Sequence, residues 1–120
     1  CKYCHTATEK SRHAAVPSLN ICMNCHLVID AGGSEHIQKL REAFYSGKPI
    51  AWQKVHLLPD HVKFNHTAHI KAGKDCQECH GKVEEMKVVE QIESLSMGWC
   101  VNCHREPENN APTNCGTCHY

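Results

Sequence analysis

Residues 100 to 104 read Cys100-Val-Asn-Cys103-His104, and the same Cys-x-x-Cys-His spacing occurs five times in the 120 residues. The other copies are Cys1-Lys-Tyr-Cys4-His5, Cys22-Met-Asn-Cys25-His26, Cys76-Gln-Glu-Cys79-His80 and Cys115-Gly-Thr-Cys118-His119, so that all ten cysteines are used. This spacing is the attachment signature of c-type haem. The two sulfurs bond to the haem vinyl groups, and the histidine is the proximal iron ligand. The sequence therefore predicts five haem c groups.

Two other uses of paired cysteines have to be weighed against haem. Zinc sites and disulfide frameworks both contain closely spaced cysteines. Neither explains why a histidine follows every pair. With 11 histidines in 120 residues, chance places one at all five positions less than about once in 100,000 sequences. The motifs therefore favour haem over both alternatives.

The composition is poor in core-forming residues. The hydrophobic share of 41% includes the ten cysteines, and without them it falls to about a third. That is too little for an ordinary protein core. We therefore expect the haems themselves to form the core. The predicted fold is a mostly irregular chain with short α-helices, wrapped around stacked haems.

Charge and targeting signals limit the possible partners. The 13 basic and 13 acidic residues cancel, which gives no support for nucleic-acid binding. Each oxidised haem adds about one negative charge, so lysines and arginines are expected near the propionates. The sequence contains neither an apolar run of membrane-spanning length nor a signal peptide. Because haem is attached outside the cytoplasmic membrane, we expect an export segment upstream of Cys1.

The spacing of the motifs predicts three parts of the chain. These are a two-haem module over residues 1–33, a helical and extended connector over residues 34–55, and a three-haem module over residues 56–120. The long gap between the second and third motifs separates the two modules.

Local patterns predict a few elements between the motifs. Residues 34–46 are expected to form a helix that ends before Gly47, with apolar residues on one face. Residues 83–95 have roughly helical apolar spacing, which predicts a short helix. Residues 52–69 are expected to be extended against porphyrin faces, and residues 106–113 to be a loop. Trp52 and Trp99 are expected to pack on haem faces.

The distal iron ligands are sought among the remaining histidines, which are His13, His36, His56, His61, His66 and His69. The firmest are His66 and His69, because their spacing places them on one helical turn from which they can reach different irons. His56 and His13 complete the predicted set, His61 stays open, and His36 is expected to face solvent. Met86 and Met97 are possible alternative ligands, although packing is the favoured role of both.

Several stretches resemble known families. The three-haem part with its Phe64-Asn-His-Thr-Ala-His69 sequence resembles the small class III multihaem cytochromes. Over nearly the whole chain, a second resemblance is more specific because it includes residues that haem attachment does not require. The strings Val16-Pro-Ser-Leu-Asn-Ile-Cys-Met-Asn-Cys-His26, Val55-His-Leu-Leu-Pro-Asp60 and Met97-Gly-Trp-Cys-Val-Asn-Cys-His-Arg105 are similar to the pentahaem cytochrome subunit of alternative complex III.

This resemblance implies a non-catalytic electron-transfer subunit on the periplasmic side of the bacterial inner membrane, within a quinol-oxidising complex. The implied partners are an iron-sulfur, molybdopterin-enzyme-like subunit, integral quinol-binding subunits, and a monohaem cytochrome c or terminal oxidase as acceptor. Similar sequences have a membrane anchor and a further Phe-x-His-x-x-His pattern before the first motif, which would place up to two distal ligands upstream of Cys1. The alternatives are a soluble periplasmic electron shuttle and a multihaem reductase with one open haem.

Overall fold

Short helices joined by irregular chain make up the whole structure. The computed structural model describes all 120 residues, Cys1–Tyr120, and contains no β-strand. In chain order the elements are α1 (Leu19–His26), α2 (Glu35–Ser46), α3 (His66–Lys71), α4 (Cys76–His80), the 3-10 helix η1 (Val83–Glu85), α5 (Met97–Arg105), the 3-10 helix η2 (Pro107–Asn109) and α6 (Cys115–Cys118). The predicted fold class is confirmed. None of the helices is long and apolar enough to span a bilayer.

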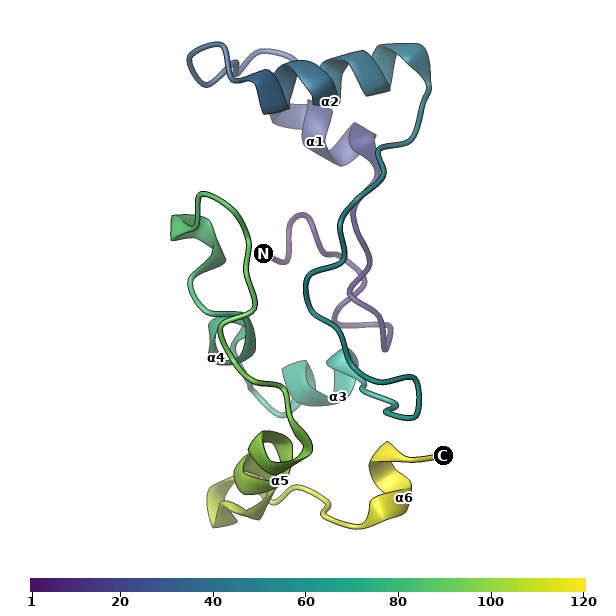
Figure 1. Cartoon of the computed structure of the whole chain (residues 1–120), viewed down its shortest axis with the longest axis vertical. Coiled ribbons are helices and arrows are strands. Elements are labelled where there is room, and N and C mark those ends of the chain that lie inside the picture. Colours follow the sequence, from purple (N-terminus) through teal and green to yellow (C-terminus); the bar gives the residue numbers. More distant parts are fainter.

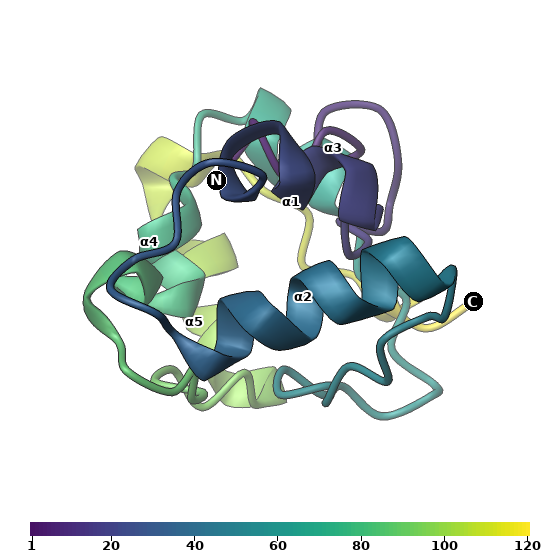
Figure 2. The ribbon, with the colours of Figure 1, turned by 90° about the horizontal axis from the view of Figure 1, so that it is seen from above.

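The elements are distributed along one long axis. The molecule measures 48 × 27 × 22 Å, and α1 and α2 occupy one end while α5 and α6 occupy the other (Figure 1). The N-terminus and α4 lie between these ends, and α3 lies between α4 and the far end. Seen along the long axis, the helices and loops are arranged around the periphery of the molecule (Figure 2). The five cysteine motifs are thereby spread over the full length.

The pair α1 and α2 forms the one protein core of ordinary kind. Met23 of α1 is 2% exposed and Ile37 of α2 is 7% exposed. The predicted helix over residues 34–46 is confirmed, since α2 follows Ser34 and ends at Gly47, whose φ of 66° is left-handed. Such a conformation favours glycine at the C-terminal cap of a helix.

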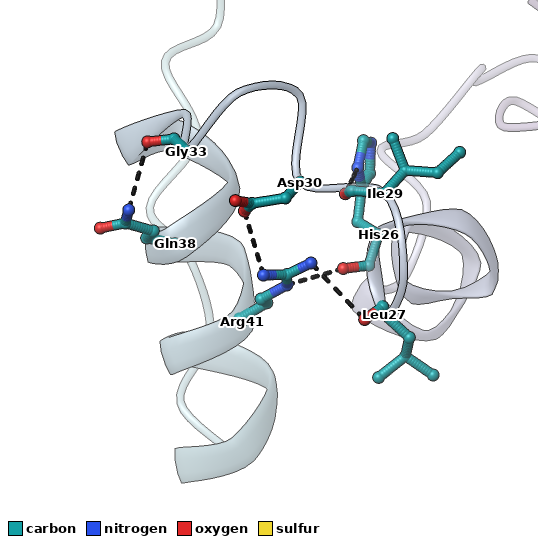
Figure 3. A network of polar contacts seen from close by, with 7 residues as sticks. All are labelled: His26, Leu27, Ile29, Asp30, Gly33, Gln38 and Arg41. Carbon is teal, nitrogen blue, oxygen red and sulfur yellow. Dashed lines mark hydrogen bonds and ion pairs between the residues drawn. The ribbon is translucent and has the colours of Figure 1, made fainter.

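Arg41 fastens α2 to the end of α1. Its guanidinium donates hydrogen bonds from Nε to the carbonyl oxygen of His26 at 2.7 Å and from Nη2 to that of Leu27 at 3.5 Å (Figure 3). Its Nη1 forms an ion pair with Asp30 at 3.1 Å. The last carbonyl groups of a helix have no partner within the helix. Arg41 supplies partners for two carbonyls beside the histidine of the second motif.

The helix predicted over residues 83–95 is wrong in most of its length. Only η1 forms there, and the chain from Met86 to Leu95 is irregular. The apolar residues do not share one helical face, because Met86 and Ile92 both pack back against Gly81. Ser96 then caps a new helix, since its hydroxyl accepts from the backbone N–H of Trp99 at 3.3 Å.

Two other expected segments hold with small changes. The segment predicted to be extended over residues 52–69 is without helix up to Asn65, after which α3 begins. The side chain of Asn65 caps α3 by accepting from the backbone N–H of Ala68 at 3.4 Å. The predicted loop over residues 106–113 is irregular apart from η2.

The polypeptide leaves much of its apolar surface uncovered. Only Met23, Ile37 and Thr8 are buried, and the accessible surface is 9047 Å². A folded monomer of 13.5 kDa is expected to expose about 6,500 Å². The excess is therefore about 2,500 Å². The exposed apolar residues of the chain include Val16, Leu27, Val28, Ile29, Trp52, Leu57, Val88 and Ile92. This surface fits a fold that is completed by large apolar groups.

We expect Gly81→Ala to destabilise the protein more than Gly73→Ala. Both glycines have positive φ, but the φ of 67° and ψ of −171° at Gly81 lie in a region that only glycine normally occupies. A Cβ at Gly81 would also lie 2.9 Å from Ile92 Cγ1, whereas a Cβ at Gly73 would meet nothing within 4 Å. The expected loss is about 1–3 kcal/mol. Thermal unfolding followed by circular dichroism measures it, and equal losses in the two variants would show that neither the backbone conformation nor the contact at Gly81 matters.

Candidate haem-binding site

Each of the five motifs forms a single helical turn or part of a helix. The second and fourth motifs lie within α1 and α5, the third is α4, and the fifth begins α6. In the first motif, the backbone N–H groups of Cys4 and His5 both donate to the carbonyl oxygen of Cys1, at 3.1 and 2.9 Å. Residues three apart on a helical turn face the same side. Both sulfurs of each motif can therefore reach one edge of a single porphyrin.

Local hydrogen bonds explain why so short a helix as α4 is stable. Asp75 precedes the third motif, and its side chain accepts from the backbone N–H of Gln77 at 2.9 Å. In return, the Glu78 carboxylate accepts from the backbone N–H of Asp75 at 2.6 Å. This capping box satisfies N–H groups that a helix start leaves unpaired.

No disulfide links any two of the ten cysteines. The structure also brings together no group of three or more His, Cys, Asp or Glu side chains that could hold a metal ion. Burial raises the pKa of the thiols of Cys79 and Cys100 above the usual range.

Four of the five motif histidines are held in one tautomer by backbone carbonyl groups. The Nδ1 bonds run from His5 to Ala15 at 2.7 Å, from His26 to Ile29 at 3.1 Å, from His104 to Pro112 at 2.7 Å and from His119 to His61 at 3.0 Å. A carbonyl oxygen can only accept, so Nδ1 carries the hydrogen. Nε2 then keeps a lone pair, as metal-binding imidazoles require.

The two histidines of α3 are held in the same tautomer by backbone carbonyl groups. His66 Nδ1 donates to the carbonyl oxygen of Arg12 at 2.9 Å, and His69 Nδ1 donates to that of Asn65 at 2.8 Å. Phe64 stacks on the His69 ring, with the ring centres 4.4 Å apart. Both Nε2 atoms therefore keep a lone pair, and the distal-ligand role of the two histidines stays a prediction.

Each α3 histidine lies close to a different motif histidine. The rings of His66 and His80 are 6.4 Å apart between centres and parallel within 4°. The rings of His69 and His104 are 5.9 Å apart. Two imidazoles that bind one metal atom from opposite sides have centres about 6 Å apart, because a metal–nitrogen bond is about 2 Å long. The geometry of these two pairs fits the axial ligands of the third and fourth haems.

His61 forms a third pair of this kind, with His119. Their ring centres are 5.5 Å apart and the ring planes differ by 24°. The sequence pattern leaves the role of His61 open, although this residue lies in the histidine-rich segment before α3. Sequence spacing alone cannot identify the pair, because its two members are brought together across 58 residues.

His56 contacts His80 but cannot share an iron with it. The two ring centres are only 4.3 Å apart, and the planes are nearly perpendicular at 84°. Burial lowers the pKa of His56, and burial followed by the charges of His56, His66 and His5 lowers that of His80. Both imidazoles are thereby favoured in the neutral form. His56 Nε2 is buried without a hydrogen-bond partner in the chain, which fits a ligand to a group outside the polypeptide.

The remaining two histidines and the two candidate methionines lie outside these ring pairs. His13 is exposed and belongs to none of the three ring pairs. His36 is exposed on α2, as the sequence predicted. Met97 is 73% exposed, and Met86 packs against Gly81. None of these four side chains is placed opposite a motif histidine by the pairs described above.

The predicted haem-packing tryptophans differ in their surroundings. Trp52 is 53% exposed and lines a groove of about 520 Å³ with Val16 and Phe44, between the start of α1 and the end of α2. Trp99 is half-buried in the first turn of α5, one residue before the first cysteine of the fourth motif.

Hydrogen bonds connect the neighbouring motifs. Asn24 Nδ2 of the second motif donates to the hydroxyl of Tyr3 in the first motif at 3.0 Å. The segment after the first motif contacts α3, since Thr67 Oγ1 donates to the carbonyl oxygen of Ser11 at 2.8 Å. The first motif is therefore linked both to α1 and to the helix that carries His66 and His69.

Comparison with known proteins agrees with this site. Residues 62–120 match the family described as cytochrome c7 and related cytochrome c. This part of the chain is a cytochrome c7-like multihaem domain, a kind of domain that binds haem c. All three ring pairs draw at least one histidine from it.

A curated relative extends the similarity beyond that domain. The chain is 35% identical over 80 residues, or 67% of its length, to the menaquinone reductase multihaem cytochrome c subunit of Nitratidesulfovibrio vulgaris strain Hildenborough. The chain spans 37% of the length of that relative.

We expect His61→Ala to convert one haem from the low-spin to the high-spin ferric state, because it removes the imidazole that faces His119. His36→Ala is the matched control, since His36 is exposed and faces no motif histidine. Electron paramagnetic resonance of the oxidised, haem-loaded protein measures the number of high-spin haems. If His61→Ala left all haems low-spin while His13→Ala did not, the assignment of His61 would be wrong.

Proposed function

We propose that this chain carries electrons through five covalently bound haem c groups as a subunit of a membrane quinone oxidoreductase complex. It is not an enzyme by itself. Its place is the periplasmic side of the bacterial inner membrane, where an upstream segment anchors it. The observation that carries this proposal is the set of five Cys-x-x-Cys-His turns spread along the 48 Å axis, three of which have a second histidine facing the first.

The proposed roles of the residues follow from their positions. When bound, each haem supplies reversible one-electron chemistry at its iron. The cysteines would hold each porphyrin, and at the third, fourth and fifth motifs the paired histidines would both bind the iron. A closed site with two strong ligands favours electron transfer over substrate binding. This arrangement supports a conducting subunit and disfavours a reductase with an open haem, at least for the third, fourth and fifth motifs.

The first two motifs complete the proposed set. The proposed modules are residues 1–33 with two haems, the connector over residues 34–55, and residues 56–120 with three haems. His56 is the proposed distal ligand for one of the first two haems, because its Nε2 is buried and unpaired. His13, or residues upstream of Cys1 as the family resemblance implies, would supply the other.

Two directions of electron flow are proposed. The resemblance to alternative complex III favours quinol oxidation, with electrons passing from an iron-sulfur, molybdopterin-enzyme-like subunit to a monohaem cytochrome c. The similarity to a menaquinone reductase subunit favours the second candidate, in which electrons pass toward menaquinone. In both cases integral subunits would bind the quinone, and this chain would connect that site to a periplasmic partner.

The direction can be measured on the native complex in membranes. If the complex oxidises quinol, added menaquinol should reduce the haems. Oxidised monohaem cytochrome c that is added afterwards should reoxidise them. If the complex reduces menaquinone, reduced cytochrome c should reduce the haems and added menaquinone should reoxidise them. His66→Ala should slow either reaction at least about tenfold, because it opens the haem of the third motif, and α4 with this motif lies between the two ends of the molecule. His36→Ala is the control and should leave the rate unchanged.

Two results would contradict the proposal. If neither quinol nor cytochrome c exchanged electrons with the haems in the native complex, the quinone oxidoreductase assignment would be lost and the soluble shuttle would be favoured. If nitrite or sulfite shifted a high-spin signal of the unmodified protein, an open catalytic haem would be present and the reductase alternative would replace this one.

A further inference from the structure

Arg12 carries a positive charge for which the chain provides no counter-charge. The residue lies between the first motif and α1, and none of the five ion pairs includes it. Its Nε is buried and has no hydrogen-bond acceptor. Arg12 as a whole is half-buried, but its Nε–H is removed from water without an acceptor, which is costly for a guanidinium that stays protonated. An anion from outside the polypeptide would remove this cost.

The guanidinium is placed beside the fifth motif. Its central carbon lies 5.7 Å from the centre of the Tyr120 ring, and Tyr120 directly follows His119. Stacking on an aromatic ring occupies a face of the planar guanidinium and leaves the N–H groups at its edge available. Those edge donors match the two oxygens of a carboxylate.

The backbone of the same residue is firmly held. The carbonyl oxygen of Arg12 accepts from both His66 Nδ1 at 2.9 Å and the His66 backbone N–H at 3.2 Å. Thr67 Oγ1 bonds to the preceding carbonyl, that of Ser11, at 2.8 Å. The start of the Arg12 side chain is therefore fixed against α3. These backbone contacts do not depend on the side chain, so they remain when Arg12 is substituted.

We propose that Arg12 binds a propionate carboxylate of the haem attached at Cys115 and Cys118. This inference rests on the proposed function in one respect, namely that a haem is attached at the fifth motif. The other two arginines differ, because Arg41 is paired with Asp30 and Arg105 is exposed. A haem attached at the fifth motif would bring two propionate carboxylates into the region beside Tyr120, where the Arg12 guanidinium lies.

The ion pair between Arg12 and the propionate would raise the reduction potential of the fifth haem. An uncompensated propionate charge stabilises the positively charged ferric iron nearby, and Arg12 neutralises that charge. Replacing Arg12 by a neutral residue should therefore favour the oxidised form. We expect a shift of about tenfold in the equilibrium of this haem, which corresponds to about 59 mV for a one-electron couple.

The test is a redox titration of the haem-loaded full chain, followed by electron paramagnetic resonance. The signal of the fifth haem is the low-spin signal lost in His61→Ala. Arg12→Gln should lower the reduction potential of this haem. The reduction equilibrium constants of the other haems should change by less than twofold. Lys10→Gln is the matched control, because it removes the same charge from an exposed residue of the same segment and should shift nothing. Arg12→Lys keeps the charge and should retain most of the potential.

An unchanged potential of the fifth haem in Arg12→Gln, or an equal shift in Lys10→Gln, would overturn the inference. If Arg12→Gln yields no haem-loaded protein, the Arg12→Lys variant is used instead. The inference would then be overturned if Arg12→Lys also failed to load haem, or if it shifted the equilibrium of the fifth haem by as much as tenfold. A separate outcome concerns the proposed function. If the unmodified protein contained no haem at the fifth motif, the proposed function would fail before the role of Arg12 could be measured.

Discussion

The hydrogen bond from histidine Nδ1 to a backbone carbonyl is the interaction on which the site depends. It recurs at four motif histidines and at both histidines of α3, and each time it leaves Nε2 as the only lone pair of the ring. Because the acceptors are main-chain atoms, the irregular segments have a definite function. They place carbonyl groups where the imidazoles need them, so the loops orient the ligands.

A second constraint is the small number of apolar side chains. The chain buries only three residues, and ordinary helix packing is confined to α1 and α2. Burying apolar surface is the main source of folding stability. In our account the haems provide most of this buried surface, and the ten cysteines bond them to the chain. Folding and haem attachment would then be tightly linked, and Arg12 would add a charged contact to the same assembly.

The sequence predicted the mostly irregular fold and the helix over residues 34–46, because the low apolar content and the helix signals can be read from composition and from residues close in sequence. The ligand roles of His66 and His69 stay predictions. The sequence prediction was wrong for one helix, and it could not supply contacts between segments that lie far apart in the chain. The apolar spacing over residues 83–95 predicted a helix, yet Met86 and Ile92 pack against Gly81. The sequence left the role of His61 open, because its neighbour His119 is remote in sequence, and it gave no sign that His56 lies beside His80. The buried, unpaired Nε of Arg12 could be found only from the fold.

The central claim is that all ten cysteines carry haem. Intact-protein mass spectrometry of the exported protein, before and after treatment with a thiol-alkylating reagent under denaturing and reducing conditions, tests it directly. Our account predicts a mass that exceeds the polypeptide by five haem groups, with no alkylation. A smaller haem number with alkylated cysteines, or a mass of the bare polypeptide, would contradict it.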